Sequence, residues 1–152
     1  VYLGVNPHTF EAGCFARAAM EGVTLGMNYG LRRLAELGVK PTQIRATGGG
    51  ANSKLWRQIM ADIFNAEVVT LKVGESAAYG AALQALWCWR LQEGEKIEIA
   101  DITDQFVQLN RAETTAPNLT NVATYQQLQA LQDELSRSLG GVFRKHRQFV
   151  LP

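Results

Sequence analysis

The sequence has few of the features that mark disulfide-rich, metal-binding or secreted proteins. Its two cysteines, Cys14 and Cys88, are far apart and lack the spacing of a metal site. We therefore expect two buried, unpaired thiols in a reducing compartment. The chain also lacks a basic start followed by an apolar run, so no signal peptide is predicted, and it has no initiator methionine. These absences predict a cytoplasmic chain that is part of a larger protein.

Charge of either sign is not in excess. The 15 lysines and arginines nearly balance the 14 aspartates and glutamates, for a net charge of +1. This balance predicts no nucleic-acid partner and no acidic tail. Hydrophobic residues make up 47% of the chain, which excludes a disordered protein. At 152 residues the chain is long enough to form a single domain over residues 1–152 with its own core.

Two common nucleotide-binding motifs are absent or incomplete. No run of the form Gly-x4-Gly-Lys-[Ser/Thr] is present, which excludes a P-loop. The dinucleotide fingerprint Gly-x-Gly-x-x-Gly is matched by Gly48 and Gly50, but Ser53 stands where the third glycine belongs. A partial match of this kind is weak support for dinucleotide binding.

A glycine-rich loop is nevertheless the most distinctive stretch of the sequence. Residues 48–50 are all glycine and lie between a predicted strand at residues 43–47 and a predicted amphipathic helix that ends near Phe64. Glycines allow a tight turn and leave the backbone open to a ligand. Asn52 or Ser53 is placed to cap the helix, whose free N–H groups and dipole favour an anion or a polar ligand edge. A purely structural turn is the alternative.

The pattern around this loop predicts an α/β fold rich in helix. The β-branched run at residues 67–72 predicts a second strand, and strand, helix and strand in so short a segment predict parallel pairing in a βαβ unit. Helices are predicted at three further segments, which are residues 11–37, 74–91 and 121–139. We expect Gly140 and Gly141 to end the last helix, and residues 111–120 to form a polar loop.

The first long helix has a smooth face. Gly22, Gly26 and Gly30 recur at every fourth position, and in an apolar segment this spacing would indicate a membrane helix pair. Charged residues in the same helix, such as Arg17 and Glu21, argue against a membrane span. We therefore expect close packing against a helix, the sheet or a second copy of the chain in a homodimer.

Three segments resemble the FGGY family of carbohydrate kinases, in the order in which that family has them. Residues 45–62, RATGGGANSKLWRQIMAD, resemble the adenosine-loop motif, and residues 75–85, ESAAYGAALQA, resemble the helix that follows it. Residues 17–23, RAAMEGV, are similar to the family segment Arg-Ala-x-x-Glu-Gly. The resemblance covers roughly the first 90 residues and is greatest to the members that phosphorylate D-xylulose.

The resemblance implies the C-terminal, nucleotide-binding portion of a two-domain sugar kinase with an actin-like, ribonuclease H-like ATPase fold. The intact protein would transfer the γ-phosphate of ATP to D-xylulose, with Mg²⁺ held mainly by the nucleotide and by the absent N-terminal half. The family's main nucleotide contacts match Gly50 and Lys54, although several relatives have asparagine at the latter position, and lysine has no acceptor to replace an amide. The nucleotide-binding residues predicted in this way are Gly48, Gly49, Gly50, Ala51, Asn52, Ser53 and Lys54.

No catalytic residue and no metal ligand is predicted within the chain. The resemblance implies that the catalytic aspartate, the sugar site and the phosphate loops precede this segment. Asp62 lies about 15 Å along its helix at 1.5 Å per residue, too far from a phosphate at the helix start, so we expect a structural role. Glu75 begins the next helix, where we expect it to be a cap. We therefore expect this chain alone to have no kinase activity.

Three alternatives share parts of this pattern. Another kinase of the same family, acting on glycerol, gluconate or ribulose, would have the same motifs. A dinucleotide-binding module would need an acidic residue at the end of the second strand, where Lys72 stands instead. A non-enzymatic packing domain would use the glycine face of the first helix as a dimer contact.

Overall fold

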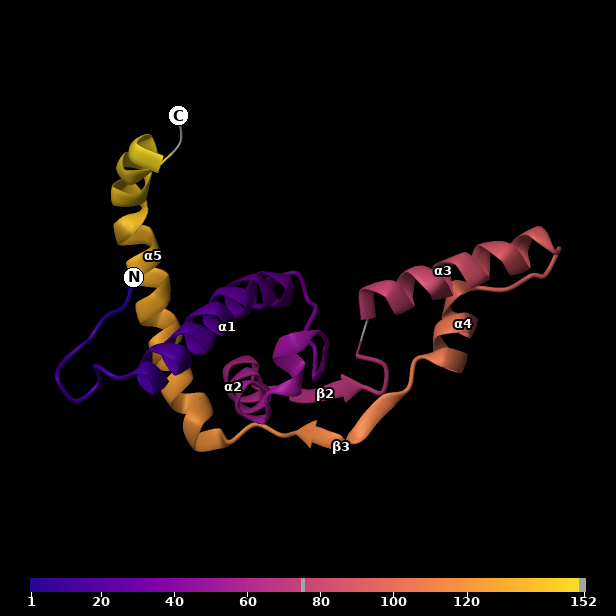
Figure 1. Cartoon of the computed structure of the whole chain (residues 1–152), viewed down its shortest axis with the longest axis horizontal. Coiled ribbons are helices and arrows are strands. Elements are labelled where there is room, and N and C mark those ends of the chain that lie inside the picture. The colour runs from indigo at the N-terminus through magenta and orange to yellow at the C-terminus, as the bar shows by residue number, and fades with distance from the viewer. Residues whose placement is uncertain (75, 151–152) are drawn as a thin grey trace. The chain divides into compact units, whose positions relative to one another are not determined.

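The computed structural model describes residues 1–74 and 76–150 as a helix-rich α/β chain (Figure 1). In chain order its elements are α1 (Ala12–Glu36), β1 (Gln43–Ala46), the 3₁₀ helix η1 (Gly49–Asn52), α2 (Lys54–Phe64), β2 (Glu67–Leu71), α3 (Ser76–Gln92), α4 (Ile99–Phe106), β3 (Leu109–Thr115) and α5 (Leu119–Val150). The predicted α/β class is confirmed.

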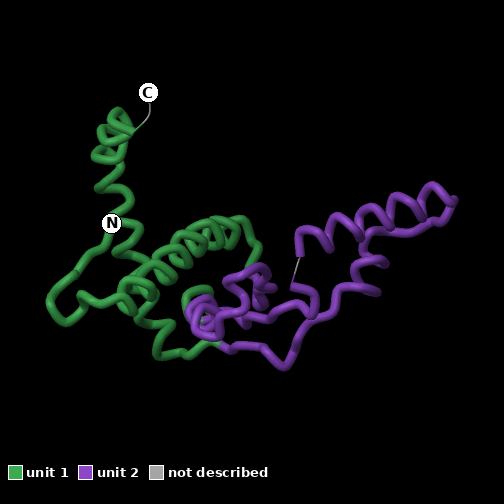
Figure 2. Tube along the Cα trace, in the orientation of Figure 1, with its two compact units in different colours: residues 1–40, 62–65, 117–152 green, residues 41–61, 66–116 purple. Residues whose placement is uncertain are grey.

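The chain divides into two compact units (Figure 2). Unit 1 consists of residues 1–40, residues 62–65 and the segment from residue 117 onward. Unit 2 consists of residues 41–61 and 66–116, and it contains the sheet and the glycine loop.

Unit 2 contains the predicted βαβ arrangement. β1 and β2 pair in parallel, with Ile44 opposite Val68, and α2 lies between them in the chain. The strand residues Val68 and Val69 are almost completely buried, as is Ile59 on α2. Their burial explains why a β-branched run and a 3.6-residue apolar period predicted these elements.

The third strand of the sheet was not predicted. β3 runs antiparallel to β2, as Figure 1 shows, with Thr70 opposite Asn110 and Leu71 opposite Leu109. The prediction of a polar loop at residues 111–120 is therefore wrong for residues 111–115, which belong to β3, and for residues 119–120, which begin α5. Most side chains of β3 are exposed, because an outer antiparallel strand can face water and needs no apolar pattern.

Unit 1 is built on two long helices, α1 and α5, which cross in Figure 1. α1 ends where predicted: Gly38 takes a positive φ of 89° and donates its N–H to the Ala35 carbonyl. The predicted end of α5 at Gly140 and Gly141 is wrong, because the helix continues to Val150. Neither glycine has a positive φ, and the cost of about 1 kcal/mol for each is borne by a helix of 32 residues.

Cys14 and Cys88 are both unpaired, as expected. The prediction that they are buried is wrong, since Cys14 is half-buried and Cys88 is exposed on α3. Among the described residues, no helix combines the length and the apolar character needed to cross a membrane.

Candidate functional site

The glycine loop forms a tight turn that leads into α2. Gly48 has a φ of 80°, a conformation that favours glycine. The turn is closed by two backbone hydrogen bonds, from the Ala51 N–H to the Gly48 carbonyl (3.0 Å) and from the Ser53 N–H to the Gly50 carbonyl (3.2 Å). Gly48 and Gly49 are exposed, so the first half of the loop presents bare backbone to the surroundings.

Ser53 is the cap of α2. Its Oγ accepts a hydrogen bond from the Trp56 N–H at 3.3 Å, and its carbonyl accepts the Arg57 N–H at 2.9 Å. Of the two cap residues considered from the sequence, Asn52 is exposed within η1 and Ser53 makes the contact.

The glycines have different local roles. A Cβ built on Gly50 would lie 3.0 Å from Cε3 and Cζ3 of Trp56, whereas a Cβ on Gly49 would meet nothing within 4 Å. Gly50 therefore makes room for the tryptophan ring, and Gly49 is the position whose missing side chain leaves space for a ligand. The sequence alone predicts an open backbone at all three glycines alike.

The backbone N–H groups of the loop also have different local roles. The N–H of Ala51, one of the predicted nucleotide-binding residues, donates to the Gly48 carbonyl. Within the part of the chain that the structure describes, the N–H groups of Gly49 and Gly50 have no hydrogen-bond acceptor, as expected for the first amides of a helical turn. These two amides are the donors that the loop offers to a polar ligand.

Arg57 is a buried cation behind the loop, which sequence reasoning gave no role. Its side chain is 7% exposed, and its Nη1 donates to the Ala51 carbonyl at 2.5 Å. The same nitrogen lies 3.8 Å from Oε2 of Glu113, which also accepts the Thr70 hydroxyl at 3.1 Å. Arg57 lies four residues before the buried Ala61 and therefore on the same face of α2. This spacing is the signal in the sequence that could have predicted its burial.

Asp62 has the contacts of a structural group. It is 2% exposed, and its carboxylate accepts the Asn118 N–H at 2.7 Å and the Asn121 side-chain amide at 2.8 Å. Lys72, at the position where a dinucleotide site needs an acid, donates to Oε1 of Gln108 at 3.0 Å. Glu75, which we expected to cap the next helix, lies outside the described residues.

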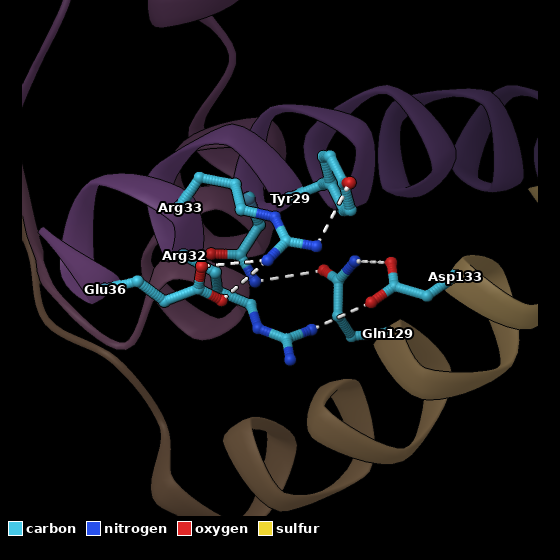
Figure 3. Close-up of polar contacts among 7 residues, drawn as sticks. Tyr29, Arg32, Arg33, Glu36, Gln129 and Asp133 are labelled. Carbon is cyan, nitrogen blue, oxygen red and sulfur yellow. Dashed lines mark hydrogen bonds and ion pairs between the residues drawn. The ribbon is translucent and has the colours of Figure 1, made fainter.

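A second polar cluster joins α1 to α5 within unit 1 (Figure 3). The Asn28 side-chain amide donates to Oε1 of Gln129 at 3.0 Å, and Gln129 donates to Oδ1 of Asp133 at 2.8 Å. Arg32 reaches Oδ2 of Asp133 at 2.9 Å. These groups are satisfied by one another, so the cluster holds two helices together. In the described ranges, no three His, Cys, Asp or Glu side chains gather as a metal site would require.

A strand, an open glycine turn and a capped helix follow one another at this candidate site, and comparison with known proteins identifies the family. The C-terminal domain of the FGGY family of carbohydrate kinases matches residues 1–89, which include the loop and both parallel strands. The chain belongs to this family. The resemblance stated from the three sequence segments is thereby confirmed.

Particular relatives are sugar kinases. The chain is 40% identical to the xylulose kinase of Haemophilus influenzae over 82% of its own length and 24% of that protein. It is 36% identical to the gluconokinase of Bacillus licheniformis over 81% of its length and 23% of that protein. The crystal structure of ligand-bound xylulose kinase from Lactobacillus acidophilus matches with a TM-score of 0.75 and 32% identity, over 96% of this chain and 28% of that one. The chain thus spans about a quarter of each relative.

Proposed function

We propose that the chain is the C-terminal, nucleotide-binding portion of a two-domain sugar kinase with an actin-like fold, which transfers the γ-phosphate of ATP to D-xylulose. The observation that carries this proposal is the family match, because it spans the open loop between β1 and α2. The N-terminal domain would be the partner that supplies the sugar site and the catalytic base, and the enzyme would act in the cytoplasm in xylose metabolism.

The loop fits a nucleotide by its backbone. The Gly49 and Gly50 amides would donate to a ribose or α-phosphate oxygen, and the absence of a side chain at Gly49 would let that oxygen approach. Lys54 is exposed at the first position of α2, where its ammonium would favour the phosphates. Asn52, also exposed, would face the ribose or the adenine edge.

Binding and orientation would be this chain's part in phosphoryl transfer, which depends mainly on positioning and on charge stabilisation. Mg²⁺ would neutralise charge on the phosphates when bound. The described residues offer no cluster of acidic ligands for it, so the nucleotide and the N-terminal domain would hold it. We accordingly propose that the chain by itself has no kinase activity.

The sugar is proposed from the relatives alone. D-Xylulose is favoured by the 40% identity to the xylulose kinase of Haemophilus influenzae over 82% of this chain, against 36% over 81% for the gluconokinase of Bacillus licheniformis. Gluconate is the second candidate because gluconokinases are also similar. A coupled assay of the full-length protein with D-xylulose, gluconate, glycerol and ribulose tests this choice. The highest kcat/KM should be for D-xylulose, and a preference for gluconate would replace it.

Gly49→Val in the full-length protein tests the nucleotide site. The branched side chain would fill the ligand's approach from a Cβ that meets nothing within 4 Å, so the KM for ATP should rise roughly tenfold while the KM for the sugar and the melting temperature stay close to wild type. Gly141→Val on α5 is the matched control, because its Cβ also meets nothing within 4 Å. An unchanged KM for ATP in the Gly49 variant would mean that the loop is a structural turn.

A further inference from the structure

We propose that Arg57 is a positioning residue of the nucleotide site, which holds the Ala51 carbonyl and thereby fixes the direction of the Gly49 and Gly50 amides. Glu113 on β3 is its counter-charge. This inference rests on the proposed nucleotide-binding role of the loop and adds two residues that never touch the ligand.

The geometry gives Arg57 two connections to the loop. Its backbone N–H donates to the Ser53 carbonyl at 2.9 Å, as a first-turn residue of α2 does, and its guanidinium returns to the Ala51 carbonyl. The Ala51 N–H is in turn bonded to the Gly48 carbonyl. Arg57 therefore holds Ala51, one of the two residues whose N–H groups close the turn. The Gly49 and Gly50 amides, which have no acceptor among the described residues, lie inside the segment that the Ala51 hydrogen bond closes.

The energetics of Arg57 argue against a role in stability alone. The side chain is 7% exposed, and its nearest carboxylate is 3.8 Å away on a glutamate that is 47% exposed. Its Nε is buried and has no hydrogen-bond partner among the described residues. A buried cation with such partners does not stabilise the fold more than an apolar side chain of the same length would. What an apolar side chain would lose is the hydrogen bond to the loop carbonyl.

β3 connects this arrangement to the sheet. Oε2 of Glu113 accepts the Thr70 hydroxyl at 3.1 Å, and Thr70 is a buried residue of β2. Arg57 thus spans from the loop to a carboxylate that is held by the central strand. The unpredicted third strand accordingly has a function, which is to hold the counter-charge of the arginine in place.

Arg57→Met in the full-length protein is the main test, since methionine keeps an apolar stem and removes both polar contacts. The KM for ATP should rise about tenfold, the scale of one charge-assisted hydrogen bond, with little change in kcat or in the KM for the sugar. Hydrogen exchange of the peptide that contains Gly49 and Gly50 should become faster in the protein without nucleotide. Arg57→Lys should recover part of the affinity, because one ammonium can still reach the carbonyl.

Asp62→Asn is the control for a merely structural effect. It removes a buried carboxylate from the same helix and should lower the melting temperature without changing the KM for ATP. Glu113→Gln, at a half-exposed position, should fold and should raise the KM for ATP less than Arg57→Met does. This variant decides the question if Arg57→Met does not fold.

The outcomes separate this inference from the proposed function. If Gly49→Val raises the KM for ATP and neither Arg57→Met nor Glu113→Gln does, Arg57 is not a positioning residue and the nucleotide site stands. If Asp62→Asn raises the KM for ATP as much as Arg57→Met at an equal loss of melting temperature, the role of Arg57 is structural. If Gly49→Val has no effect either, the nucleotide site itself is wrong.

Discussion

Polar side chains serve different purposes in the two units. In unit 2, the Arg57 guanidinium donates to the Ala51 carbonyl of the glycine loop, and the Ser53 hydroxyl accepts the Trp56 N–H at the start of α2. The Gly49 and Gly50 amides of that loop have no acceptor among the described residues. In unit 1, Asn28 on α1 donates to Gln129 on α5. Gln129 in turn donates to Asp133 on the same helix (Figure 3). The first arrangement holds the shape of the glycine loop, and the second fixes how two helices pair. Substitutions in the two units should therefore affect different measurements.

The largest effect is expected where the loop both packs and binds. Gly50→Val in the full-length protein would place its Cβ against Trp56, so we expect a loss of about 1–3 kcal/mol of unfolding free energy together with a higher KM for ATP. Differential scanning calorimetry and ATP kinetics measure the two changes. Gly50→Ala would not avoid the clash, because the first added carbon already meets the ring. A melting temperature equal to that of wild type would show that Trp56 moves aside at no cost.

A purely structural effect is expected in unit 1. Gln129→Leu leaves the buried amide of Asn28 without its acceptor and should lower the unfolding free energy by about 1–2 kcal/mol. The double variant with Asn28→Leu removes both partners and should recover part of that loss, as measured by urea unfolding. Neither variant should change the KM for ATP in the full-length protein. A change in that KM would mean that helix pairing in unit 1 and nucleotide binding in unit 2 are coupled.

A smaller effect on stability, which depends on alkaline pH, is expected from a further contact between α1 and α5. Tyr125 donates to Oε1 of Glu21 at 2.8 Å, and burial, followed by this hydrogen bond, raises the pKa of Tyr125. Because the folded protein holds the phenolic proton more tightly, the contribution to stability is complete below the unfolded pKa of about 10 and is lost as the pH rises through the folded pKa.

Tyr125→Phe should therefore differ most from wild type below a pH of about 10, and the difference should shrink at higher pH. Urea unfolding at a series of pH values measures it. A difference that grows as the pH rises would show that the ionised phenol is the form that the folded protein prefers.

The parts of the fold that could be predicted were those with a repeating apolar pattern. The period of α2 and the β-branched run of β2 gave the βαβ unit to within a residue or two at each end. β3 could not be predicted, because Arg111 and Glu113 are exposed on an outer strand and leave no alternation to recognise. The continuation of α5 through Gly140 depends on the length of the helix and not on the local residues.

The candidate site likewise has features that the sequence predicts and contacts that it does not. Glycine content, a capping residue and the following helix located the loop, and Ser53 is the cap that this reasoning included. The contact of Trp56 with Gly50, and that of Arg57 with Ala51, depend on how η1 turns the chain back over the start of α2. No spacing rule for a regular helix gives these contacts. They separate Gly50, which packs against Trp56, from Gly49, whose missing side chain leaves open space. The sequence alone does not distinguish these two glycines.

The smallest effect is expected for the exposed charge at the start of α2. Lys54 is the one charged side chain of the predicted nucleotide site, and two charges about 8 Å apart in water interact by roughly 0.5 kcal/mol. Lys54→Ala in the full-length protein should thus raise the KM for ATP only about twofold at low salt, and less at physiological ionic strength, where the Debye length is about 8 Å. Steady-state kinetics over a salt series measures the change.

Because screening acts on charges and not on the backbone hydrogen bonds of Gly49 and Gly50, the difference between Lys54→Ala and wild type should vanish in high salt while that of Gly49→Val persists. A large increase that salt does not reduce would instead place the Lys54 side chain in direct, desolvated contact with the nucleotide, and the loop would then bind by a side chain as well as by its backbone.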